Sequence, residues 1–115
     1  MTKNKHFLFS YGTLQLAQVQ IKNYGRLLTG KKDRLPSYKL EKLKITDREV
    51  IAKSGQEFHP IAIKTDSFND FIKGTIFEIT ELELQETDKY EVNDYQRVLE
   101  TFSSGQKAWV YIAVI

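Results

Sequence analysis

The hydrophobic residues of this sequence lie mostly in short runs separated by polar turns, which is typical of strands rather than of long helices. Leu40 and Leu43 fall out of phase within one such run, so we expect a β-bulge there. Gly74 stands inside another run, where a glycine suits a sheet that must bend. The pattern predicts strands at residues 7–9, 38–45, 50–52, 60–63, 73–79, 95–102 and 108–115.

One segment carries a clear helix signal. Thr80 is followed three residues later by Glu83, which is the spacing of a capping box, and this predicts a helix over residues 81–90. Residues 15–24 show weaker helical spacing, and Gly25 is placed to end that piece. Strands therefore dominate, and we expect a single α+β domain over residues 1–115, built on a small mixed β-barrel with short flanking helices.

Composition narrows the class of protein. The 115 residues include 17 Lys and Arg against 15 Asp and Glu, giving a formal charge of +2, and no cysteine. Zero cysteines exclude a disulfide framework and a thiolate nucleophile. The charge is small and no stripe of basic and aromatic residues occurs, so we expect no nucleic-acid partner. The longest apolar run, residues 108–115, is too short to cross a membrane, so we expect a soluble, cytoplasmic protein without membrane partners.

Few residues offer chemistry. The sequence holds two histidines, His6 and His59, far apart, so we expect no metal site, no Ser-His-Asp triad and a structural role for His59. Glu91 continues the helical face of Leu84 and Asp88. From this spacing alone, a solvated Glu91 at a helix end is the favoured interpretation, and a partly desolvated base is the alternative.

A glycine turn follows the first strand. Its residues are Tyr11, Gly12, Thr13 and Leu14. Backbone N–H groups in such a turn can form an anion-binding nest, although an ordinary connection between strand and helix has the same composition.

Six short segments then resemble, in order, the motifs of one family. The segments are residues 7–14, 35–40, 59–62, 72–79, 87–97 and 109–111. They are similar to the YGTL, LPGYxL, YPA, VxGxLYxI, LDxYEgxxYxR and AxVY segments of γ-glutamylcyclotransferase-like (AIG2-like) proteins. Ser37 and Val92 stand where that family often has glycine, and Thr87 where it has leucine.

The resemblance implies a function and a set of site residues. It implies that Glu91 is the general acid/base and that the turn of residues 11–14 holds a small γ-glutamyl substrate. It implies release of 5-oxoproline by intramolecular aminolysis without a cofactor. The alternative is a non-catalytic module of the same fold that binds a small ligand. The leaving amine and the oligomeric state are left open by the sequence.

The remaining expectations concern the surroundings of Glu91. Tyr11, Tyr95 and Tyr111 are candidate wall residues with hydroxyl donors. Asp88 is expected to bond backbone amides, and Arg97 to pair with a carboxylate.

Overall fold

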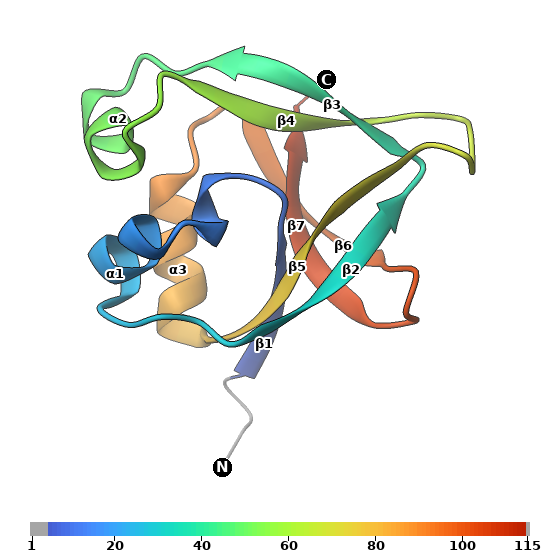
Figure 1. Ribbon diagram of the computed structural model, residues 1–115, viewed down its shortest axis with the longest axis horizontal. Coiled ribbons are helices and arrows are strands. Elements are labelled where there is room, and N and C mark those ends of the chain that lie inside the picture. The colour runs from blue at the N-terminus through green and yellow to red at the C-terminus, as the bar shows by residue number, and fades with distance from the viewer. Residues whose placement is uncertain (1–4, 115) are drawn as a thin grey trace.

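The computed structural model describes residues 5–114 and contains seven strands and three α-helices within them (Figure 1). The strands are β1 (Lys5–Ser10), β2 (Gly30–Pro36), β3 (Tyr38–Lys44), β4 (Phe58–Lys64), β5 (Phe71–Thr80), β6 (Tyr95–Thr101) and β7 (Lys107–Ala113). The helices are α1 (Ala17–Tyr24), α2 (Arg48–Ser54) and α3 (Glu81–Tyr90), with a short 3-10 turn, η1 (Thr13–Gln15), before α1.

The strands form two sheets. Five of them lie in the order β2-β5-β1-β7-β6, and β1 runs parallel to β7 while the other neighbours are antiparallel. β3 and β4 pair with each other as a separate two-stranded sheet. The predicted α+β class is therefore confirmed. The predicted closed barrel is not found within residues 5–114, because β2 and β6 remain the two edges of the larger sheet.

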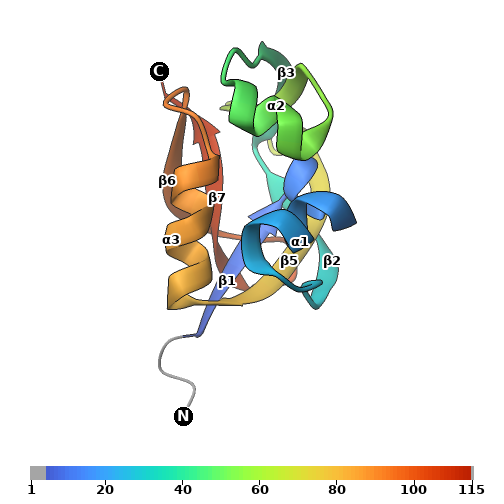
Figure 2. The same cartoon turned by 90° about the vertical axis from the view of Figure 1, so that its left-hand side faces the viewer.

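The larger sheet has a hydrophobic core on each face. Neighbouring residues of β1 point to opposite sides, so Leu8 belongs to one core and Phe9 to the other. The core around Leu8 is closed by α1 and α3, whereas the core around Phe9 is closed by β3 and β4 through Tyr38 and Ala62. Figure 2 shows the three helices gathered on one side of the molecule. The C-terminal end of β1 thus emerges where helices and both sheets come together.

Helix α3 follows the sequence prediction closely. The Thr80 hydroxyl accepts a hydrogen bond from the N–H of Glu83, and the Glu83 carboxylate accepts one from the N–H of Thr80. The helix ends at Tyr90, as predicted. Gly25 ends α1 in the left-handed conformation, with φ of 72°, which also agrees with its predicted role.

Three local predictions are wrong. Residues 50–52 lie in α2 and not in a strand, because the Asp47 side chain caps the N–H groups of Glu49 and Val50. No bulge interrupts β3, whose residues pair one to one with β4 from Tyr38 to Lys44. The segment 15–24 is not one helix, since Leu16 is extended and separates η1 from α1.

Candidate active site

The turn after β1 is held against the neighbouring strands by close backbone approaches. Gly74 of β5 lies beside the end of β1, where a Cβ would come within 2.4 Å of the Ser10 carbonyl oxygen. Gly12 lies against β4, and a Cβ there would be 3.1 Å from Cγ of Pro60. Glycine therefore fits at Gly12 and at Gly74, and a larger residue at either position would meet the neighbouring chain.

The same turn presents backbone donors. The carbonyl oxygens of Gly12 and Thr13 accept hydrogen bonds from the N–H groups of Gln15 and Leu16, which forms η1. Apart from bonds within a helix or strand, the N–H groups of Thr13 and Leu14 donate to no backbone carbonyl oxygen of residues 5–114. The N–H of Gly12 makes only a long contact of 3.4 Å with Oγ of Ser10. Donors at the start of a helical turn are suited to bind an anion or a polarised carbonyl oxygen.

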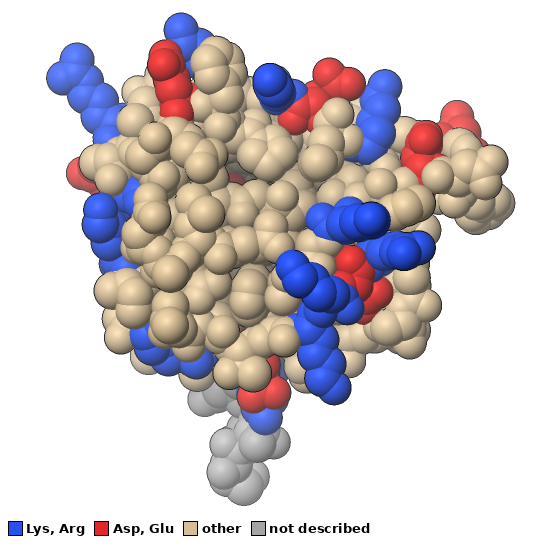
Figure 3. Space-filling view, viewed as in Figure 1, with Lys and Arg blue, Asp and Glu red and all other residues tan. Residues whose placement is uncertain are grey.

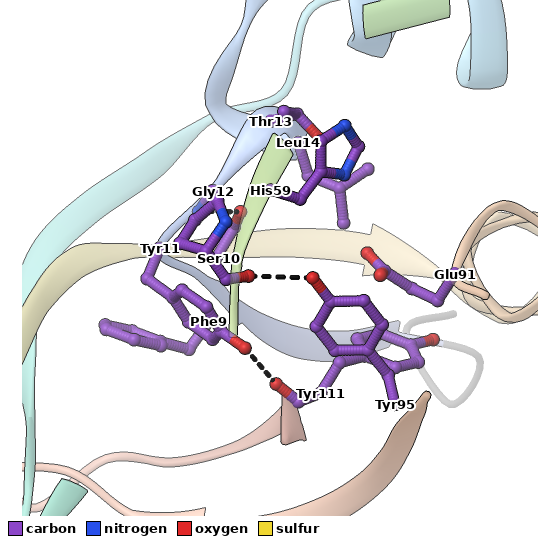
Figure 4. A pocket seen from close by; sticks show the side chains of 11 residues that line it. Phe9, Ser10, Tyr11, Gly12, Thr13, Leu14, His59, Glu91, Tyr95 and Tyr111 are labelled. Atoms are coloured by element: carbon purple, nitrogen blue, oxygen red, sulfur yellow. Dashed lines mark hydrogen bonds between the residues drawn. The ribbon is translucent and has the colours of Figure 1, made fainter. Parts of the chain in front are cut away.

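Glu91 lies directly after α3. Its N–H caps the helix by donating to the Thr87 carbonyl at 3.0 Å, and its own backbone is extended. The side chain is half-buried in the interior and is directed toward the turn (Figure 4). Burial, together with the negative charge of Asp88, raises the pKa of Glu91 to about 8. Such a carboxyl can both accept and donate a proton near neutral pH.

The turn and Glu91 line one pocket, although about 77 residues separate them along the chain (Figure 4). The pocket is small, with a cavity volume of about 30 Å³. A buried hydrogen bond of 2.8 Å between Oγ1 of Thr13 and the hydroxyl of Tyr90 fixes the turn to the end of α3. The full lining is Phe9, Ser10, Tyr11, Gly12, Thr13, Leu14, His59, Pro60, Glu91, Tyr95 and Tyr111. All predicted site residues are thus brought together, and we refer to this cavity as the Glu91 pocket.

The three tyrosines form walls of the pocket, but their hydroxyl protons are used within the protein. Tyr11 donates to the carbonyl oxygen of Tyr111 at 2.6 Å and accepts from the N–H of Ala62. Tyr95 donates to the Pro60 carbonyl at 2.7 Å, and the Tyr111 hydroxyl donates to Asp88. These hydroxyls are therefore donors, and each of them donates to an acceptor of the protein itself. Burial raises the pKa of all three, so they stay neutral.

Asp88 has different partners from those expected. Within residues 5–114 it bonds no backbone amide, and its carboxylate instead accepts a hydrogen bond from the Tyr111 hydroxyl and lies 3.0 Å from Nε of Arg97. The prediction that Arg97 pairs with a carboxylate is confirmed, and its guanidinium also covers the Trp109 ring at 4.4 Å. Its partners are thus side chains of β7 and β6.

Sequence reasoning did not place Ser10, His59 or Pro60 in the pocket. His59 is buried, its Nε2 lies 3.1 Å from Oγ of Ser54, and burial lowers its pKa, so it stays neutral. Its structural role is consistent with the prediction. His59 reaches the pocket with Pro60 of the same strand, β4, and its one signal in the sequence is the motif-like segment 59–62.

Two further features can be reported for the described part of the chain. No three His, Cys, Asp or Glu side chains in residues 5–114 are grouped so that they could hold a metal ion. None of the helices in that range has the length and apolar character needed to span a membrane.

Comparison with a family model covers nearly the whole described part of the chain. The model of the family described as gamma-glutamyl cyclotransferase, AIG2-like, matches residues 8–114. The chain belongs to this family. Residues 8–114 include every residue that lines the Glu91 pocket, so the pocket lies wholly within the matched region. A search of curated proteins found no match.

Solved structures show the same AIG2-like fold. A protein from Arabidopsis thaliana has 23% sequence identity and a TM-score of 0.71, and the match covers 96% of this chain and 62% of that one. A gamma-glutamyl cyclotransferase has 14% identity and a TM-score of 0.69, with 96% and 67% covered. The allophanate hydrolase of Kluyveromyces lactis has 12% identity and a TM-score of 0.73, with 96% of this chain and 18% of that chain covered. The chain thus spans less than two thirds of the Arabidopsis protein.

Proposed function

We propose that the chain is a γ-glutamyl cyclotransferase that releases 5-oxoproline from a γ-glutamyl amine or γ-glutamyl amino acid. The observation that supports this most is the position of Glu91, a half-buried carboxyl that faces the backbone donors of the turn across one small pocket. Membership of the AIG2-like family supports the same reaction.

The reaction needs a base. The α-amine of the substrate attacks the carbonyl carbon of its own γ-amide, and a five-membered ring closes as the old C–N bond breaks. An α-ammonium has a pKa of roughly 8 and cannot attack while it carries its extra proton. Glu91, with its pKa raised to about 8, is matched to that ammonium, so proton transfer between the two is nearly balanced in free energy.

Glu91 then serves as the acid. Ring closure releases a further proton from the attacking nitrogen, and the leaving nitrogen must gain protons before it departs as an amine. Of the three protons on the starting ammonium, one stays on the lactam nitrogen and two end on the leaving nitrogen. Glu91 carries them across and returns to its starting state, so no metal or cofactor enters the proton balance.

The turn supplies the remaining chemistry. The N–H groups of Thr13 and Leu14 are placed to bind either the substrate α-carboxylate or the γ-carbonyl oxygen as its negative charge grows. The rings of Tyr11, Tyr95 and Tyr111 enclose the substrate chain and hold the amine near its own carbonyl, which is a proximity effect.

The test is detection of 5-oxoproline from a panel of γ-glutamyl amines and γ-glutamyl amino acids. We expect turnover of at least one member and a fall of about 10²- to 10⁴-fold in kcat for Glu91→Gln, the usual worth of a general base. The Gln variant keeps the shape of the side chain, so ligand binding should survive. Binding of panel members without 5-oxoproline from any of them would instead identify a non-catalytic ligand-binding module.

A further inference from the structure

A second surface feature lies beside the Glu91 pocket and has no part in the mechanism. It is a groove lined by Gln15, Lys32, Asp33, Arg34, Lys73, Gly74, Ser103 and Ser104, which we call the basic groove. Figure 3 shows Lys and Arg side chains gathered over β2 and β5 on the face toward the viewer. None of the three cations lining the groove forms an ion pair within residues 5–114.

The strand register explains why these charges gather. Lys32 pairs with Thr75, and Arg34 pairs with Lys73, so all four side chains project from the same face of the sheet. The guanidinium of Arg34 is supported by the Phe71 ring at 4.9 Å. The three cations are therefore held side by side on an exposed face at the edge of the sheet.

The carboxylate that lines the groove is already used. Asp33 lies between Lys32 and Arg34 in sequence, so its side chain starts on the opposite face of β2. It accepts hydrogen bonds from the N–H and the hydroxyl of Ser104 in the loop between β6 and β7. The groove keeps an excess of positive charge that favours an anionic ligand.

The basic groove and the Glu91 pocket have no lining residue in common, but hydrogen bonds and strand pairing link their linings. Ser10 lines the pocket and pairs with Thr75, whose hydroxyl donates to Gln15 of the groove at 3.1 Å. Gln15 in turn contacts the Gly12 carbonyl at 3.4 Å. β2 is two strands from β1, which at about 4.8 Å per strand places the backbone of Lys32 and Arg34 roughly 10 Å from β1, whereas Lys73 lies on β5, the strand next to β1. An extended peptide covers that distance with about three residues.

We propose that the substrate of this protein is a γ-glutamyl group attached to an acidic peptide, whose carboxylates two or three residues beyond the γ-amide bind Lys32, Arg34 and Lys73 in the basic groove. The proposal rests on the cyclotransferase function proposed above. A leaving group that ends at the mouth of the pocket, such as a small neutral amine, would leave all three cations unused.

The experiment compares two peptides that differ only in charge. One is γ-glutamyl-Ala-Glu-Glu amide, and the other is γ-glutamyl-Ala-Gln-Gln amide. We expect kcat/KM for the acidic peptide to be about tenfold higher at low salt, as two exposed ion pairs would give, and the difference to shrink toward nothing at about 0.5 M salt. The double variant Lys32→Glu/Lys73→Glu should bring the ratio to one or below.

The matched control is Lys22→Glu/Lys89→Glu, which changes the net charge by the same amount on α1 and α3, away from the groove. It should keep the tenfold ratio. If both peptides yield 5-oxoproline with equal kcat/KM at low salt, the proposed substrate class is wrong and the proposed function stands.

Binding provides a readout that does not depend on turnover. Fluorescence anisotropy of the labelled peptides on Glu91→Gln should show the same tenfold preference for the acidic one. If neither peptide is turned over, the proposed function fails for them, while this measurement still decides whether the groove binds acidic peptides. A single-stranded oligonucleotide and the unlabelled acidic peptide can each be added to displace the labelled acidic peptide. Displacement by the oligonucleotide at a far lower concentration than by the unlabelled peptide would overturn the assignment to a peptide.

Discussion

Replacing Glu91 with glutamine should stabilise the protein, by an amount that grows with pH. The pKa of Glu91 is about 8 in the folded chain against 4.5 for an ordinary glutamate. At pH values between these two, Glu91 keeps its proton in the folded state and has lost it in the unfolded state. The free energy of unfolding of the wild type therefore falls as pH rises from about 4.5 to 8. At 1.36 kcal/mol for each pKa unit, the cost is about 1 kcal/mol at pH 5, about 3 kcal/mol at pH 7 and about 4–5 kcal/mol above pH 8.5. Glutamine cannot ionise and avoids this cost.

Urea unfolding at pH 5, 7 and 8.5 measures the difference between the two proteins directly. The matched control is Glu86→Gln, an exposed residue of α3 whose carboxylate pairs with Lys89 at the surface. We expect its effect to stay within about 0.5 kcal/mol at every pH. A difference between wild type and Glu91→Gln that does not change with pH, or that shrinks as pH rises, would show that Glu91 ionises as a solvated carboxylate does.

The remaining predictions concern the surroundings of the pocket. Gly12→Val should abolish binding of a γ-glutamyl peptide in calorimetry and leave the circular dichroism spectrum unchanged, because the added side chain meets Pro60 and fills the turn; wild-type affinity would refute this. Asp88→Asn should lower the free energy of unfolding by about 1–2 kcal/mol, since it weakens the bonds to Tyr111 and Arg97. It should also shift the acidic limb of the kcat/KM profile to lower pH, because the charge of Asp88 raises the pKa of Glu91; an unshifted limb would contradict the coupling. Ser37 has a φ of 64°, a conformation that is strained for a residue with a Cβ and not for glycine. Ser37→Gly should therefore raise the free energy of unfolding by about 1 kcal/mol in thermal melts, and Ser37→Ala, which keeps the Cβ, should not.

Much of the fold could be predicted because local signals agreed with the tertiary structure. The capping box at Thr80 and Glu83 gave the start of α3. Helix α2 was missed because Val50 and Ile51 are β-branched, while the signal that decided the structure was the Asp47 cap. The bulge was inferred because Leu40 and Leu43 are out of phase for one face of a strand. The strand is regular, and Leu40 is simply exposed on the open face of a two-stranded sheet.

The site was only partly accessible from the sequence. Helical spacing alone favoured a solvated Glu91, and only the ordered family motifs singled out the residue and its turn. The hydroxyl partners of Tyr11 and Tyr95 are carbonyl oxygens of β7 and β4, and no sequence pattern specifies which backbone group a buried hydroxyl meets. The same holds for Asp88, whose partners come from β6 and β7.

The parallel pairing of β1 with β7 sets the order in which the protein can become functional during its synthesis. The turn of residues 11–14 is synthesised about 100 residues before Tyr111, which closes the pocket and whose carbonyl oxygen accepts the hydrogen bond of the Tyr11 hydroxyl. A nascent chain that lacks β7 can form the β1–β5 pair and α3, yet it leaves the edge of β1 exposed and the pocket open. Contacts between residues so far apart in sequence also form slowly. β7 must therefore be synthesised before the chain can hold a ligand, and until then the bare edge of β1 is the surface on which a chaperone would act.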